Sequence, residues 1–105
     1  MSWDKETILF YGLPSYKVDT SKISSEKYYD FIEDCYINLT PYKVDGEIYY
    51  GLIVIIIDNE EVYSVKSILE DEPALKRDLF NFFKEYNVSI TDNAEPQFYL
   101  AERYI

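Results

Sequence analysis

The sequence predicts a single α+β domain, a two-layer sandwich in which two helices cover one face of a mainly antiparallel sheet of about four to five strands. The chain has 105 residues, which is the length of one domain, so we treat residues 1–105 as one unit. Some of its apolar segments have the composition of strands, and others repeat with helical spacing. Along the chain these segments follow the order β-α-β-β-β-α-β.

The longest apolar segment, Ile48–Ile57, has ten residues, about half of what a membrane-spanning helix needs. It is rich in β-branched residues and tyrosine, and turn residues precede and follow it. These features predict a long strand that is buried on both faces. We expect it at the centre of the sheet with a neighbour on each side, because an open apolar edge would invite aggregation.

Turn signals predict the other strands. Asp45-Gly46 is typical of a tight hairpin turn, which would join residues 42–44 to the central strand. Residues 58–61 then turn the chain into a third strand over residues 62–68, and the three strands form an antiparallel meander. Residues 7–13 and 97–104 are expected at the outer positions of the sheet.

Two segments have the periodicity of amphipathic helices. The first begins at Ser24 or Ser25, and its apolar positions are Tyr28, Phe31, Ile32, Cys35, Tyr36 and Leu39. The second begins near Asp71, carries Pro73 in its first turn and ends at Asn87. Its apolar positions are Leu75, Leu79, Phe82, Phe83 and Tyr86.

Several classes of function are disfavoured by composition. The chain has no histidine, so every Ser-His, Cys-His and His-metal arrangement is absent. Its three glycines are too dispersed for a phosphate-binding loop. We therefore expect no catalytic residues, no cofactor and no metal, and we expect that the protein is not an enzyme. The single thiol, Cys35, lies on an apolar helix face after two acids, which predicts a core residue rather than a nucleophile.

The cysteine count and the N-terminus predict the compartment. A single cysteine cannot form an internal disulfide, which is typical of a reducing environment. The first residues are polar and contain no apolar segment of the kind found in signal peptides. We expect a cytoplasmic protein.

The distribution of charge is the most informative feature. The formal net charge is −10, and eleven of the twenty acidic residues fall between Tyr28 and Glu72, where there are only two lysines. This charge opposes direct binding to nucleic acid or to an anionic membrane, because phosphates would be repelled. The favoured partner is a basic protein.

One helix concentrates these acids. Glu26, Asp30, Glu33 and Asp34 share the face opposite the apolar positions, with Tyr29 beside them. Their average spacing of about 3–4 Å along the helix approaches the phosphate spacing of a nucleic-acid strand. The alternative is a solvated face that keeps the protein soluble. Other acid pairs and runs have a simpler structural interpretation, as a turn or as a helix N-terminus.

Together these features predict a small acidic inhibitor that occupies a basic, nucleic-acid-binding site of a partner. The partner would be a nuclease or another nucleic-acid enzyme, as for phage anti-CRISPR and anti-restriction proteins. The predicted partner-binding residues are Glu26, Tyr29, Asp30, Glu33, Asp34, Glu60, Glu61, Glu70, Asp71 and Glu72. The alternatives are a toxin-neutralising immunity protein, a structural or oligomeric accessory protein, and an enzyme or small-ligand binder. An edge strand could pair two copies into a homodimer.

Overall fold

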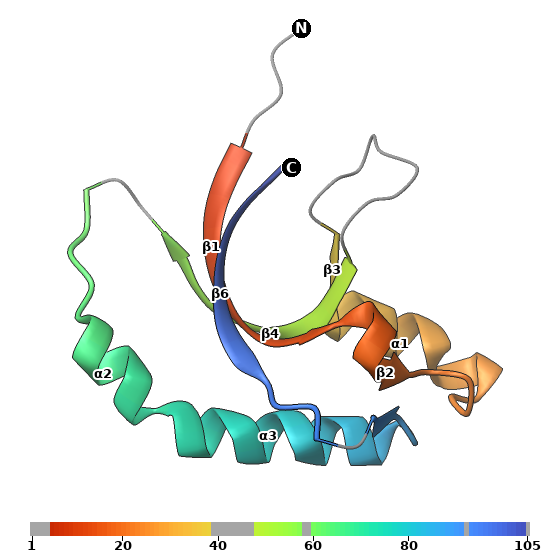
Figure 1. Cartoon of the computed structure of the whole chain (residues 1–105). Helices are drawn as coiled ribbons and strands as arrows, with labels where there is room; N and C mark the ends of the chain where they lie inside the picture. Colours follow the sequence, from red (N-terminus) through yellow and green to blue (C-terminus); the bar gives the residue numbers. More distant parts are fainter. Residues whose placement is uncertain (1–4, 39–47, 58–59, 92, 105) are drawn as a thin grey trace, which may run out of the picture.

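The computed structural model describes residues 5–38, 48–57, 60–91 and 93–104. Four strands form an antiparallel sheet in the order β3 (Tyr36–Asn38), β4 (Ile48–Ile57), β1 (Lys5–Pro14) and β6 (Gln97–Tyr104). Helices α1 (Ser25–Cys35) and α3 (Glu72–Glu85) pack against one face of this sheet (Figure 1). The predicted two-layer α+β fold is confirmed.

The main core lies between the two layers. Tyr11 and Leu13 of β1 face Phe31 and Cys35 of α1, and α3 adds buried side chains of its own. Phe31 is fully buried, and its ring centroid lies 5.5 Å from that of Tyr50. Rings of α3 surround it on the other side, at 5.8 Å for Phe82 and 5.5 Å for Tyr86. Burial of these aromatic side chains is the main force that holds the helices to the sheet.

The opposite face of the sheet carries a second, smaller core. Ile8, Phe10 and Ile37 are buried there, and Tyr49 and Tyr99 pack against them. The rings of Phe10, Tyr49 and Tyr99 have centroids 4.9–5.3 Å apart. The strands bend strongly away from the helices (Figure 1), and the pairing of β1 with β4 shifts register between Leu9 and Phe10. Such a bulge increases the local bend and twist.

The predicted positions of two strands need correction. β1 pairs with both β4 and β6, so the expectation that residues 7–13 form an outer strand is wrong. The physical reason is that β1 carries apolar side chains on both faces, Ile8 and Phe10 on one and Tyr11 and Leu13 on the other. β6 does lie at an edge, as predicted. β4 has neighbours on both sides only at Ile48, Tyr49 and Tyr50, where β3 pairs with it.

The rest of β4 has a paired strand on one side only, within the part of the chain that is described, and two local contacts lie along its other side. The Gly51 N–H donates to the Cys35 thiol, and the Tyr63 hydroxyl donates to the Ile56 carbonyl oxygen at 3.5 Å. Between these two positions lies the bulge. Bulges and local side-chain contacts are common means of protecting an edge strand from another chain.

The predicted strand over residues 62–68 is wrong, because this segment contains helix α2 (Val65–Glu70). Ser64 caps the helix, with its Oγ accepting the Ser67 N–H at 3.3 Å. Val65, Ile68 and Leu69 repeat with helical spacing, which here prevails over their strand propensity. The three-strand meander is therefore not formed. Its predicted hairpin at residues 42–46 lies outside the described residues.

The two predicted helices differ in how well the sequence placed their ends. α3 begins at Glu72, one residue after Asp71, and Asn87 follows its end in a left-handed conformation, φ 59°. α1 begins as predicted but ends at Cys35, because Tyr36 and Ile37 pair with β4 instead.

A 3₁₀ turn, η1 (Ser15–Lys17), and a small sheet of β2 (Val18–Asp19) and β5 (Ser89–Ile90) were not predicted. Over the described ranges, every helix is too short or too polar to cross a bilayer.

Candidate protein-binding surface

Helix α1 presents the predicted acidic residues to solvent. Phe31 and Cys35 point into the core, and helical periodicity then turns the opposite side outward. Glu26, Tyr29, Asp30 and Glu33 lie on that outer side, Asp34 lies at its flank, and all five are exposed. We call this set the α1 acidic face. Tyr29 is its most prominent aromatic residue, 80% exposed, and its ring lies 6.3 Å from that of Tyr28.

The acids near the end of α1 are poorly placed for helix stability. Glu33 and Asp34 lie in the last turn, where the helix dipole favours cations, and this turn contains no basic residue. Each carboxylate there costs roughly 0.3–1 kcal/mol at an exposed position. Acidic residues at a helix C-terminus conflict with helix stability, and conflicts of this kind are expected at functional sites.

The acidic surface continues onto α3. The pKa of Tyr86 is raised by burial, then by the charges of Glu85, Asp30 and Asp34. The charges of these three carboxylates therefore all act on the Tyr86 phenol, whose ring centroid lies 5.5 Å from that of Phe31 in α1. Glu85 adds to the α1 acidic face, and the sequence offers no signal for it because only tertiary packing brings it there.

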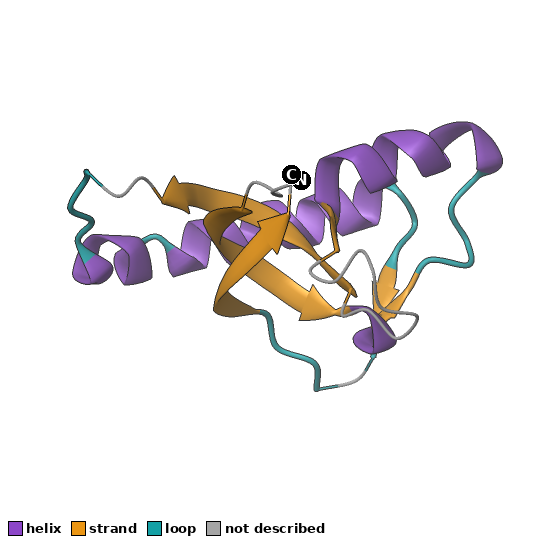
Figure 2. Cartoon of the chain, turned by 90° about the horizontal axis from the view of Figure 1, so that it is seen from above, coloured by secondary structure: helices purple, strands orange, loops and turns teal. Residues whose placement is uncertain are grey.

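The remaining predicted residues lie elsewhere. Glu60, Glu61, Glu70 and Asp71 are exposed around α2, which lies at the opposite end of the molecule from α1 in both views (Figures 1 and 2). The structure therefore divides nine of the ten predicted residues between two separate surfaces. They do not form one continuous interface.

Glu72 differs from the other acids because it faces the core. It is partly buried, and the Tyr11 hydroxyl donates to its carboxylate. Burial, followed by the charge of Glu72, raises the pKa of Tyr11 to about 12. Glu72 thus ties the first turn of α3 to the sheet, a structural role that the sequence did not indicate.

Exposed apolar side chains accompany the second acidic group. Val62 is 99% exposed, Val65 67% and Leu69 53%. Sequence reasoning missed this apolar surface because it assigned Val62 and Val65 to a strand that would pack in the sheet. The helical spacing of Val65 and Leu69 is the signal that could have found it.

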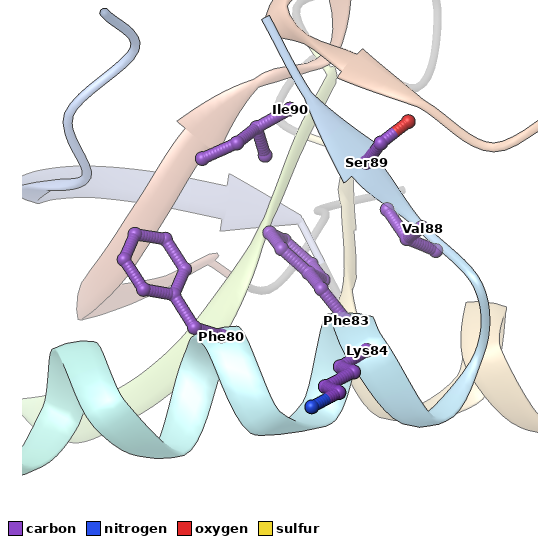
Figure 3. Close-up of a pocket in the computed structure, with 6 residues that line it drawn as sticks. All are labelled: Phe80, Phe83, Lys84, Val88, Ser89 and Ile90. Atoms are coloured by element: carbon purple, nitrogen blue, oxygen red, sulfur yellow. The ribbon is translucent and has the colours of Figure 1, made fainter. Parts of the chain in front are cut away.

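An open apolar hollow lies between α3 and β5 (Figure 3). Its volume is about 280 Å³, and Phe80, Phe83, Val88 and Ile90 supply most of its wall. Lys84 and Ser89 are its polar lining residues. None of the lining residues that the structure describes is a carboxylate. It is also smaller than most pockets that bind drug-sized ligands.

Among the residues described, no three Asp, Glu or Cys side chains gather closely enough to hold a metal ion. Cys35 is 2% exposed, and burial, followed by the charge of Asp34, raises the pKa of its thiol to about 12. The prediction that Cys35 is a core residue is confirmed.

The chain was compared with known proteins at three levels. It matches no protein-family model, no curated protein and no solved structure.

Proposed function

We propose that this protein binds a basic protein partner through the α1 acidic face and blocks the partner's nucleic-acid-binding site. The observation that carries the proposal is a row of exposed carboxylates, with Tyr29 among them, on a helix anchored by Phe31 and Cys35. A site that binds phosphates offers Lys and Arg side chains, which also bind carboxylates. The partner proposed is a nuclease or another nucleic-acid enzyme in the cytoplasm.

Rigidity and composition both support this use of the surface. The eight helical steps from Glu26 to Asp34 span about 12 Å, so several charges are held at fixed spacing. A preordered array loses less entropy on binding than a flexible acidic tail would. Tyrosine is frequent at the energetic centres of interfaces, and a charged rim accelerates association with a partner of opposite charge.

The same surface suits two kinds of inhibitor. A phage protein that blocks a CRISPR or restriction nuclease and an immunity protein that neutralises a nuclease toxin both present acidic groups to a phosphate-binding site. The identity of the partner separates them. The accessory-protein alternative is favoured by a different feature, the edge of β6 that no strand of the described residues covers.

The test is the association kinetics of the protein with a partner purified from the native host. In one variant Asp30, Glu33 and Asp34 are changed to Lys, and in the matched control Glu61, Glu70 and Asp71 are changed to Lys. Both variants alter the charge equally, but at opposite ends of the molecule. We expect the α1 variant to associate at least about tenfold more slowly at low salt, with a difference that shrinks as salt screens the charges.

Competition supplies the second measurement. Nucleic acid added to the complex should displace the protein, because both would occupy one site. If the two triple variants slow association equally, or if salt has no effect, the α1 acidic face is only a solvated surface. If nucleic acid and the protein bind the partner together, the proposed blocking of its site is wrong.

A further inference from the structure

The edge of the sheet formed by β6 is long and regular. All eight residues of β6 pair with β1, from Gln97 opposite Gly12 to Tyr104 opposite Lys5, without a shift in register. On its other side β6 has no partner among the strands that the structure describes. β6 contains no proline, and its pairing has no bulge, so this edge lacks the protection that β4 has.

The β6 edge is also electrically neutral. It carries one acid, Glu102, and one base, Arg103, and the Arg103 guanidinium contacts the Glu6 carboxylate of β1. Near the middle of the strand Leu100 is 66% exposed. On a chain of net charge −10, this is a surface where two copies can meet without placing acids against acids.

The other exposed surfaces do not fit a second copy. The α1 acidic face would meet its own carboxylates across a two-fold axis, because a two-fold contact brings the same patch from both copies together. The apolar residues Val62, Val65 and Leu69 lie among Glu61, Glu70 and Asp71, so the same repulsion applies there. Of these exposed surfaces, the β6 edge is therefore the one whose charge best allows contact with a second copy.

We propose that two copies pair antiparallel through β6, with Leu100 of one copy opposite Leu100 of the other. In this register Tyr99 lies opposite Ala101 of the second copy, and Phe98 lies opposite Glu102. Gln97 lies opposite Arg103, so no like charges face each other. The two sheets join into one of eight strands, and the helices of both copies stay on the same side. This inference is independent of the proposed inhibitory partner.

The area of contact makes this a weak dimer. About seven paired residues span about 24 Å of strand, and such a contact buries less than the roughly 800 Å² per partner of a typical stable interface. We expect dissociation constants of about 10 µM or weaker. Each copy has a charge of −10, so added salt should strengthen the dimer by screening their general repulsion. This salt effect is opposite to that expected for the complex with a basic partner.

Sedimentation equilibrium over about 10 µM to 1 mM protein, at low and high salt, tests the proposal. The mass should rise from 12.5 kDa toward twice that value as concentration and salt increase. Leu100→Lys places two ammonium groups opposite each other and should weaken the dimer at least about tenfold. Leu69→Lys is the matched control, an exposed leucine on α2, and should leave the dimer unchanged.

A cross-linking variant tests the register without depending on the lysine variant folding. Leu100→Cys should form a covalent dimer under mild oxidation, because directly opposed Cβ atoms lie within disulfide reach. Leu69→Cys should remain monomeric. The proposal is overturned by a protein that stays monomeric at about 1 mM in high salt. Equal effects of the two lysine variants would also overturn it, as would cross-linking of the Leu69→Cys variant but not of the Leu100→Cys variant.

Discussion

Two glycines lie opposite each other in the antiparallel pair of β1 and β4, and their replacement tests the packing of the sheet. Gly12 pairs with Gly51, and neither has a positive φ, so what requires glycine is the close approach of the strands. A Cβ on Gly12 would lie 2.2 Å from the Tyr50 carbonyl oxygen and 2.7 Å from Gly51 Cα. A Cβ on Gly51 would lie 2.5 Å from the Tyr11 carbonyl oxygen.

The magnitude follows from these distances. The strands must separate by about 1 Å to restore ordinary contacts, and overpacking of this kind costs about 1–3 kcal/mol. Replacing glycine by alanine also restricts the unfolded chain, which returns about 0.4–1 kcal/mol of stability. Gly12→Ala should therefore destabilise the fold by about 1.3 kcal/mol, equivalent to a Tm lower by roughly 5–10 °C in a domain of this size.

The assay is urea unfolding followed by circular dichroism, with the midpoint compared at constant slope. Gln97→Ala is the control, because Gln97 pairs with Gly12 from β6 yet is exposed, and it should change stability by less than about 0.5 kcal/mol. If Gly12→Ala unfolds at the same urea concentration as the parent protein or at a higher one, the close approach of β1 and β4 is not as described.

Further predictions concern the core and its ionisable groups. Phe31→Ala removes the ring at the centre of the main core and should cost about 3–5 kcal/mol in urea unfolding, whereas Tyr29→Ala on the exposed side of α1 should cost less than about 0.5 kcal/mol. Similar losses in the two variants would contradict the assignment of the buried face. The pKa values of Cys35 and Tyr11 are both raised to about 12, from 9.0 and 10.0 respectively. Their protons are held more tightly in the folded state, so the stability they contribute is intact below about pH 9 and is lost as the pH rises toward about 12. Unfolding midpoints measured at increasing alkaline pH should fall, and Cys35→Ala should make the fall shallower than in the parent protein. A midpoint that is constant across this range would refute the expectation. At about pH 8 the native Cys35 thiol should react with a thiol reagent far more slowly than the unfolded chain does.

Sequence reasoning succeeded where structure depends on nearby residues. α3 was recognised from its apolar spacing and from Pro73, and its end was recognised from Asn87. β4 was recognised from an apolar run too short to span a membrane. The outer side of α1 was also predictable, since burial of Phe31 and Cys35 determines which residues point away from the core.

Predictions from local sequence patterns gave the wrong secondary structure for two segments. Tyr36 and Ile37 continue the apolar spacing of α1, yet pairing with β4 draws them into β3. Val62, Val65 and Ile68 have strand propensity, but the Ser64 cap and helical spacing place the last two in α2. The first choice depends on a contact between segments whose energy the residues of one segment do not reveal. The second was signalled locally, by the Ser64 cap and the helical spacing, and was missed.

The sequence by itself determined the fold class, the acidic character of the protein and the outward face of α1, because each follows from composition or from the geometry of a single element. Only the tertiary structure decided that β1 is an interior strand beside β4 and that β6 is left as an edge. It also separated the acids of α1 from those of α2 and turned Glu72 inward to Tyr11. The physical reason is that strand order and the grouping of charges depend on contacts between segments far apart in the chain, which local periodicity does not encode.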